Sequence, residues 1–224
     1  MQVTEELNIN GVPLAIMEKP VDIFLEPGEV GAILEMIVRD KNGKVTEYRK
    51  MPSKSFVKQM VQLLFVRAAG LWRVYNYISI TDTANAAQNV GVSTSGCYPF
   101  LCDAGVGITT NGIVVGTGAV APTINDYALG TLIAHGVGAG QLQYSAMSFG
   151  APANDASVSQ FRLTRDFANG SGGAITVNEC GIYVQANDSA GNIRYFCTIR
   201  DVTGGINVPN GQTLTLNYQM QATV

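Results

Sequence analysis

The sequence has few charged residues. Asp, Glu, Lys and Arg make up 14% of its 224 residues, whereas a soluble domain usually has about 25%. The net charge of −3 excludes a domain whose electrostatics are built for nucleic acid. A soluble monomer usually carries a charged surface. Because this chain has so few charges, we expect part of its surface to be covered by neighbouring subunits.

Histidine is almost absent. His135 is the only one, which removes most zinc sites and leaves one candidate for Ser-His or Cys-His catalysis. No Cys, Asp or Glu lies near it in the sequence, and we interpret it as structural. The best candidate for a calcium loop, residues 187–192, lacks the required acidic density. The sequence therefore predicts no catalytic, cofactor-binding or metal-binding residues.

Targeting and membrane signals are also lacking. Residues 1–6 are acidic and have neither the basic nor the apolar region of a signal peptide. No run reaches about 18 apolar residues, so we expect no membrane span. The spacing of Cys97 and Cys102 fits neither a redox motif nor a zinc site. We expect cytoplasmic synthesis, with Cys180, Cys197 and the other two as small buried side chains; a disulfide is the alternative.

The charges that are present lie mostly at the front of the chain. Residues 1–67 hold nine Lys or Arg and nine Asp or Glu, and residues 68–224 hold the other five and eight. The last lysine is Lys58. This shift predicts a boundary near residues 68–71, with a docking module over 1–70 and a body over 71–224.

The front part predicts an extended arm, a hairpin and one helix. Prolines interrupt the arm. Residues 31–39 and 45–49 flank an Asn-Gly pair typical of a type I′ hairpin turn. The helix is expected to begin at a Ser53 or Ser55 cap and to end by Gly70. Its periodicity predicts an apolar side that faces the core and a polar side that faces solvent. The apolar side comprises Phe56, Met60, Leu63 and Leu64, and the polar side comprises Lys54, Lys58, Gln59 and Gln62.

The body reads as strands. Short apolar or alternating runs are separated by turn residues, and no helical crossover lies between them. This pattern indicates an antiparallel β-sandwich or jelly-roll-like fold. These runs cover residues 71–80, 112–116, 141–147, 161–165 and 194–200. The last strand is expected to place Leu214, Leu216, Tyr218 and Met220 on one face. Ile206 and Val208 are expected in its hairpin partner, across a turn at 209–212.

One strand has a break in its alternation. Ile175 and Val177 share one parity, and Ile182 and Val184 share the other. A β-bulge near residues 179–181 would reconcile them. Without the bulge, Glu179 would face the core, where we would expect an arginine partner or a shifted pKa. An ordinary solvated glutamate is the remaining alternative.

Two further motifs have ordinary explanations. Residues 116–121 match G-x-G-x-x-A after a strand, but Pro122 follows where a dinucleotide site needs a helix. We therefore expect a turn. A modest basic cluster is interpreted as a solvated face, with an electrostatic docking surface for an acidic neighbour as the alternative. It comprises Lys41, Lys44, Arg49, Lys50, Lys54 and Lys58.

Several stretches resemble virion proteins of tailed bacteriophages. They are residues 112–118, 122–129, 167–183, 200–202 and 208–214. The resemblance covers about residues 110–224 and consists of turns and strand ends. It implies a β-rich protein made in the host cytoplasm and assembled in symmetric copies on the head, neck or tail. It carries over no catalytic residues.

The expected function is that of a non-enzymatic structural component of a virion. Its expected partners are copies of itself and other virion proteins (capsid, neck or tail), with no nucleic acid, membrane or cofactor. A carbohydrate-binding module for host adhesion is one alternative, with candidate aromatics Trp72, Tyr75, Tyr77 and Tyr98. A cell-wall hydrolase is a weaker alternative, because it needs two facing carboxylates and the body offers one glutamate, Glu179, with scattered aspartates.

Overall fold

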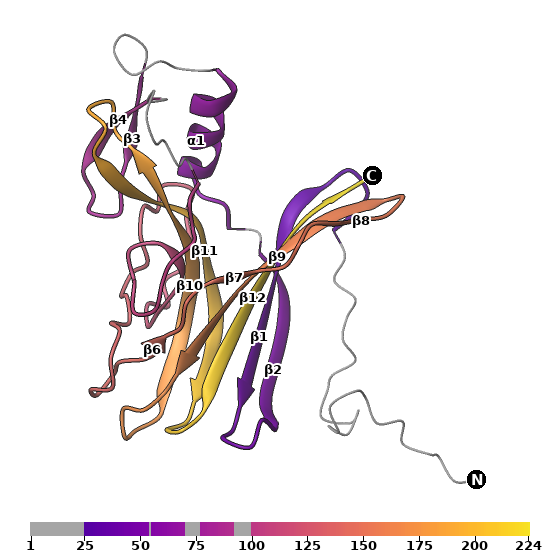
Figure 1. Ribbon diagram of the computed structural model, residues 1–224, viewed down its shortest axis with the longest axis vertical. Coiled ribbons are helices and arrows are strands. Elements are labelled where there is room, and N and C mark those ends of the chain that lie inside the picture. The colour runs from indigo at the N-terminus through magenta and orange to yellow at the C-terminus, as the bar shows by residue number, and fades with distance from the viewer. Residues whose placement is uncertain (1–24, 54, 70–76, 92–99) are drawn as a thin grey trace.

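The fold is mainly β, with antiparallel sheets forming a sandwich-like body and a single helix among the residues that the structure describes (Figure 1). A computed structural model describes residues 25–53, 55–69, 77–91 and 100–224. The predicted β-rich class is confirmed. The predictions for most of the arm, for Gly70 and for residues 71–76 of the expected strand lie outside the described residues. The same holds for the predictions that name Lys54, Trp72, Tyr75, Cys97 and Tyr98.

A seven-stranded sheet forms one layer, in the order β2-β1-β12-β9-β6, with β7 and β8 also paired to β9. Its inner face is apolar because alternate residues along β1 and β12, such as Leu34 and Leu216, are fully buried. Its strands are β1 (Val30–Arg39), β2 (Val45–Ser53), β6 (Gln143–Tyr144), β7 (Ser148–Phe149), β8 (Ala153–Asn154), β9 (Val158–Ala168) and β12 (Thr213–Thr223).

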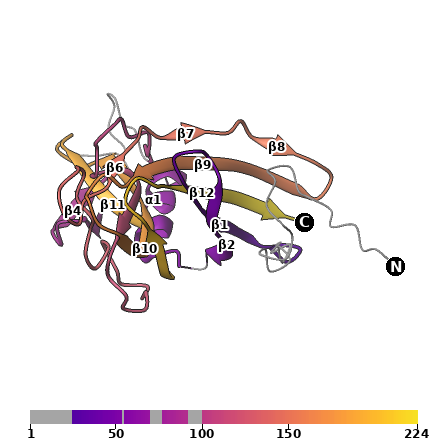
Figure 2. The ribbon, with the colours of Figure 1, turned by 90° about the horizontal axis from the view of Figure 1, so that it is seen from below.

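A three-stranded sheet, in the order β11-β10-β5, forms the second layer. A separate β3–β4 pair and helix α1 lie at one end of it (Figure 1). Seen from below, β9 and β12 run past this layer to a tip that carries β8 and the C-terminus (Figure 2). The elements are α1 (Lys58–Ala68), β3 (Ile78–Thr81), β4 (Ala87–Val90), β5 (Gly112–Gly116), β10 (Ile175–Asn187) and β11 (Ile193–Val208).

The predicted hairpin is confirmed as β1 and β2, but its turn differs from expectation. Gly43 has a φ of 82°, and Asn42 is not among the non-glycine residues with positive φ. A type I′ turn needs positive φ at both positions. Asp40 instead closes a longer loop, accepting the N–H groups of Asn42 and Lys44 on its carboxylate.

The compositional boundary near residue 70 does not divide the sheets. β1 pairs with β12 over its whole length, from Val30 opposite Ala222 to Arg39 opposite Thr213. The front hairpin is therefore part of the large sheet, and charge along the chain does not mark a separate unit there.

The helix begins later and is rotated relative to the prediction. Val57 is the N-cap residue and makes no side-chain capping bond. Ser53 ends β2 instead, and its hydroxyl donates to Asp201. Gln59 and Leu63 are buried whereas Leu64 is exposed, so the predicted inward and outward sets are partly wrong. The Gln59 amide Nε2 donates to the Thr81 carbonyl of β3 at 3.4 Å, while its Oε1 is buried without a hydrogen-bond partner among the described residues.

The last strand alternates as predicted, but its expected hairpin with Ile206 and Val208 is wrong. β12 pairs with β1 and β9, while β11 pairs with β10 in the other sheet. The turn at residues 209–212 therefore crosses between the two layers. Asn169 holds this crossing, because its backbone bonds to Gly211 and Gln212.

A polar cluster lies between the two layers. The Tyr218 hydroxyl of β12 donates to Asp201 of β11 at 2.9 Å and lies 3.2 Å from the Cys180 sulfur of β10. Ser53 donates to the same Asp201 oxygen at 2.7 Å. Burial raises the pKa of Asp201 and outweighs these hydrogen bonds, which act in the opposite direction. The Asp201 carboxyl joins β11 to β2 and β12, and the Tyr218 hydroxyl adds a contact to β10.

Candidate functional site

Glu179 is a fully buried carboxylate on β10. The predicted irregularity exists, but its extra residues belong to β11: Val177 pairs with Ile206 and Glu179 pairs with Val202. Glu179 therefore keeps the parity of Val177 and turns to the side opposite Cys180, which contacts the large sheet. The break in alternation arises because β10 is covered on both faces, by the large sheet and by loops.

The Glu179 carboxylate accepts hydrogen bonds from three backbone N–H groups and one arginine. Its Oε1 accepts from Gly118 at 3.0 Å and Thr131 at 2.8 Å. Its Oε2 accepts from Gly130 at 3.0 Å and from Arg200 Nε at 2.9 Å. Since a carboxylate offers about four acceptor positions, this side chain has no free position for a substrate. The expected arginine partner is confirmed.

Arg200 extends the cluster from β11 into the loops. Its Nη1 donates to Asp126 at 2.6 Å and its Nη2 to the Val120 carbonyl at 2.9 Å. Burial alone would lower the pKa of Arg200, but the bonds to Asp126 and Glu179 raise it. Burial would also raise the pKa of Asp126, and hydrogen bonds from Thr123 and Arg200 reverse this and lower it. Both groups are therefore held in their charged forms.

The glycine motif after β5 surrounds this carboxylate. A Cβ atom at Gly116 or Gly118 would collide with Glu179 Oε1. The glycines are thus needed for close backbone approach to an anion, as in phosphate-binding loops, but the anion is the protein's own side chain. The interpretation as a turn agrees with this geometry.

Arg165 of β9 is a second buried arginine, and sequence reasoning missed it. It is 0% exposed, and burial lowers its pKa to about 10. Its guanidinium lies 4.9 Å from the centre of the Tyr144 ring and donates to backbone carbonyls within the loops and beside them. The acceptors are Gly105, Ile108, Asn111, Ile113 and Ser145.

These two arginines hold two loop segments on either side of β5, residues 104–111 and 117–142, which we together call the loop layer. Its one charged residue is Asp126, which is paired with Arg200. Apolar side chains nevertheless face outward from it: Val106, Ile108, Val120, Ile124, Leu132 and Val137. Val120 is 76% exposed and Val137 is 58% exposed. The loop layer is an uncharged, apolar surface with internal ionic anchors.

The predicted candidates for chemistry do not come together. His135 is on the exposed side of the loop layer, and its Nδ1 accepts the Tyr144 N–H at 3.0 Å. Among the described residues, no group of three or more His, Cys, Asp or Glu side chains could hold a metal ion. A hollow of about 230 Å³ is lined by uncharged residues only: Ser55, Phe56, Pro122, Thr123 and Ile124.

The remaining sequence candidates are dispersed. Cys180 and Cys197 are buried, and no disulfide joins the three cysteines that can be described. Arg49 pairs with Glu47 on β2 at 2.8 Å. The other described members of the basic cluster lie in the β1–β2 turn (Lys41 and Lys44), on β2 (Lys50) and on α1 (Lys58). Tyr77 is 49% exposed. No helix within the described ranges is long and apolar enough to cross a membrane.

No protein-family model, curated protein or solved structure matches the chain. The resemblance to virion proteins of tailed phages therefore stays a prediction.

Proposed function

We propose that this protein is a non-enzymatic structural subunit that assembles in symmetric copies, as a component of a tailed-phage virion. The loop layer carries the proposal. Exposed apolar patches mark interaction surfaces, and interface cores are depleted in charged side chains. In the loop layer both properties occur over the same residues, with Asp126 neutralised by Arg200.

The anchoring of the loop layer supports the same role. Loops usually lose conformational freedom when they bind, which weakens association. Here Arg165 and Arg200 hold the loops from below, one from each sheet. The surface is thus preorganised before a neighbour meets it.

The state of the acidic residues also favours a structural role over hydrolysis. Glycoside hydrolysis needs an acid and a second carboxylate with access to the substrate. Glu179 is saturated by four donors, and Asp126 is bound by Arg200 and Thr123. Both carboxylates serve to position loops.

The test is the mass of the purified full chain, measured by light scattering across a range of concentrations. We expect an oligomer that dissociates at least tenfold more readily after Val120→Asp combined with Val137→Asp. Ile193→Asp is the matched control, because Ile193 is 53% exposed but lies outside the loop layer. A stable wild-type monomer that does not bind phage particles would contradict the proposal.

A further inference from the structure

Helix α1 has an exposed apolar stripe that no described segment covers. Val61 is 66% exposed, and Leu64 and Phe65 are each 50% exposed. With Ala68 they follow the spacing i, i+3, i+4, i+7, which places them on one side of a helix. The opposite side, with Leu63 and Val66, is buried. The stripe is therefore a surface with an apolar partner still to be identified.

The charge of the helix indicates what that partner is. Lys58 and Arg67 are its charged residues, and it contains no Asp or Glu. Arg67 is exposed and forms no ion pair with another described residue. An occupant should therefore be apolar and acidic.

Residues 1–24 of the chain have this composition. They contain Glu5, Glu6, Glu18 and Asp22 against one base, Lys19, giving 1 − 4 = −3. Apolar residues are interspersed among these charges, including Leu7, Ile9, Leu14, Ile16, Ile23 and Phe24. The segment is complementary to the helix in charge and offers enough apolar side chains to cover the stripe.

The position of residue 25, where the described chain begins, bears on which copy's helix residues 1–24 would bind. Leu25 contacts Gly31 at the start of β1, in a tip formed by residues 25–30, 153–161 and 222–224. This tip and α1 lie at the same end of the molecule and on opposite sides (Figure 1). Side-by-side copies would therefore place the tip of one near the helix of the next.

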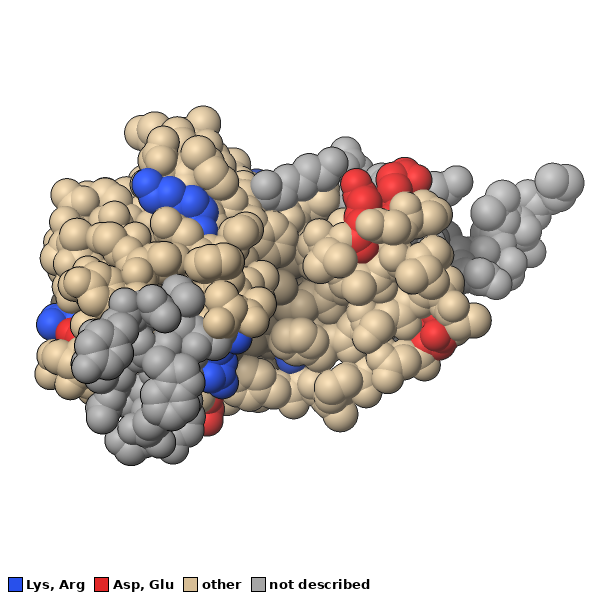
Figure 3. All heavy atoms as spheres, turned by 90° about the horizontal axis from the view of Figure 1, so that it is seen from above, with Lys and Arg blue, Asp and Glu red and all other residues tan. Residues whose placement is uncertain are grey.

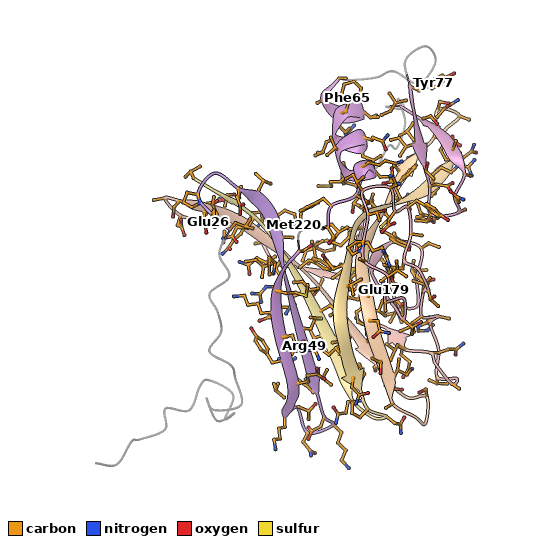
Figure 4. All side chains as sticks on the ribbon, turned by 180° about the vertical axis from the view of Figure 1, so that it is seen from behind. Glu26, Arg49, Phe65, Tyr77, Glu179 and Met220 are labelled. Atoms are coloured by element: carbon orange, nitrogen blue, oxygen red, sulfur yellow. The ribbon has the colours of Figure 1, made fainter. Side chains whose placement is uncertain are left out.

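Charge and length agree with this arrangement. Glu26, Glu29 and Asp155 make the tip acidic, with no base in its three segments, whereas the charged side chains of α1 are basic. The surface is hollowed between the tip and the helix end, with acidic side chains on the tip side (Figure 3). Phe65 lies on the side of α1 that faces this hollow (Figure 4). An extended arm of 24 residues reaches about 80 Å, enough to enter the hollow of an adjacent copy.

We propose that residues 1–24 of one copy bind the Val61–Leu64–Phe65 stripe of helix α1 on a neighbouring copy. The contact is head-to-tail, and such contacts close into rings when the rotation between subunits permits it. This inference rests on the proposed self-assembly and names one of its contacts. It is independent of the loop layer.

The experiment places a photo-crosslinking phenylalanine analogue at position 65 of the full chain. Unlabelled and ¹⁵N-labelled copies are mixed before irradiation, and the linked peptides are identified by mass spectrometry. We expect crosslinks to peptides from residues 1–24 that join one labelled and one unlabelled copy. The same analogue at position 193 should give no links to that segment.

Arg67→Glu should reduce the yield of these crosslinks at least fivefold, and Lys41→Glu, an exposed charge reversal at the β1–β2 turn, should leave it unchanged. Links to residues 1–24 within the same copy only, links to other segments, or no links would each overturn the inference. The mass of the wild-type chain separates the two proposals. An oligomer without these crosslinks removes the arm contact alone, whereas a stable monomer that does not bind phage particles removes the proposed function as well.

Discussion

Arg200 and Glu179 form a buried ion pair that joins the small sheet to the loop layer, with Nε and Nη2 of the arginine each 2.9 Å from Oε2 of the glutamate. The pair spans β11 and β10, and each partner has further bonds to loop residues. Its geometry makes the loops above the sheet part of the folded core. The consequences can be measured on single variants.

Arg200→Met should destabilise the protein by about 3–5 kcal/mol, because it leaves Glu179 and Asp126 without their cation and Glu179 buried. Urea unfolding would measure this loss. Arg194→Met is the matched control: Arg194 also pairs with an aspartate, but its side chain is 36% exposed. Because Asp188 keeps the hydrogen bonds from the Ala190 and Asn192 N–H groups, we expect a smaller loss, of about 1 kcal/mol. Equal losses for the two variants would show that the buried pair has no special role.

Gly118→Ala should destabilise the fold by about 1–3 kcal/mol, the usual cost of forcing extra atoms into a packed site. The new methyl group would overlap the Glu179 carboxyl. Gly173→Ala serves as the control, since a Cβ atom there meets nothing within 4 Å. Thermal unfolding of both variants would measure the loss of stability. A stable Gly118→Ala protein would contradict the close approach of loop and carboxylate.

Asp201→Asn should change how stability depends on pH. Burial raises the pKa of Asp201 in the fold, above its unfolded value of about 3.9. The folded state therefore binds this proton more tightly, and the contribution of Asp201 is complete below about pH 4 and lost as pH rises through the folded pKa. The stability of the wild type relative to Asp201→Asn should fall over that range.

Urea unfolding at several pH values would measure this difference. Asp155→Asn is a control of opposite sign. Hydrogen bonds from the Ser157 and Val158 N–H groups lower the pKa of Asp155, so its contribution is present above the unfolded pKa and lost as pH falls. If the stability difference between wild type and variant changed with pH in the same direction for both variants, the assigned environment of Asp201 would be refuted.

Arg165→Lys should loosen the loop layer and cost at least about 2 kcal/mol, because a single ammonium cannot reach the carbonyls that the guanidinium fork satisfies. Hydrogen exchange should become faster in residues 105–113. Arg162→Lys, at an exposed position three residues earlier on the same strand, should change neither quantity. Unchanged exchange in Arg165→Lys would mean that these carbonyls do not need the guanidinium.

The large elements could be predicted from local pattern. Asn42 and Gly43 mark the first hairpin, and alternation in residues 214–220 marks the last strand. The turn at residues 209–212 carried the same kind of signal and was misinterpreted, because turn chemistry specifies a reversal of the chain but not the sheet that it enters.

The candidate site was less accessible to this reasoning. Glu179 could be singled out because it broke the parity of its strand, and the arginine partner could be anticipated. Arg165 was missed, because arginine normally faces water. The available signal was strand parity: Arg165 alternates with Leu163 and Phe167, which are both buried.

The sequence by itself determined the β-rich class, the hairpin, the alternating strands and the scarcity of charge, because these depend on composition and on neighbours along the chain. Only the tertiary structure decided that Arg165, Glu179 and Arg200 are buried, since their partners lie in loops that are distant in sequence. A charge is tolerated in the interior only where opposite charges or aligned backbone dipoles surround it. Those surroundings exist only once both sheets and the loop layer have come together.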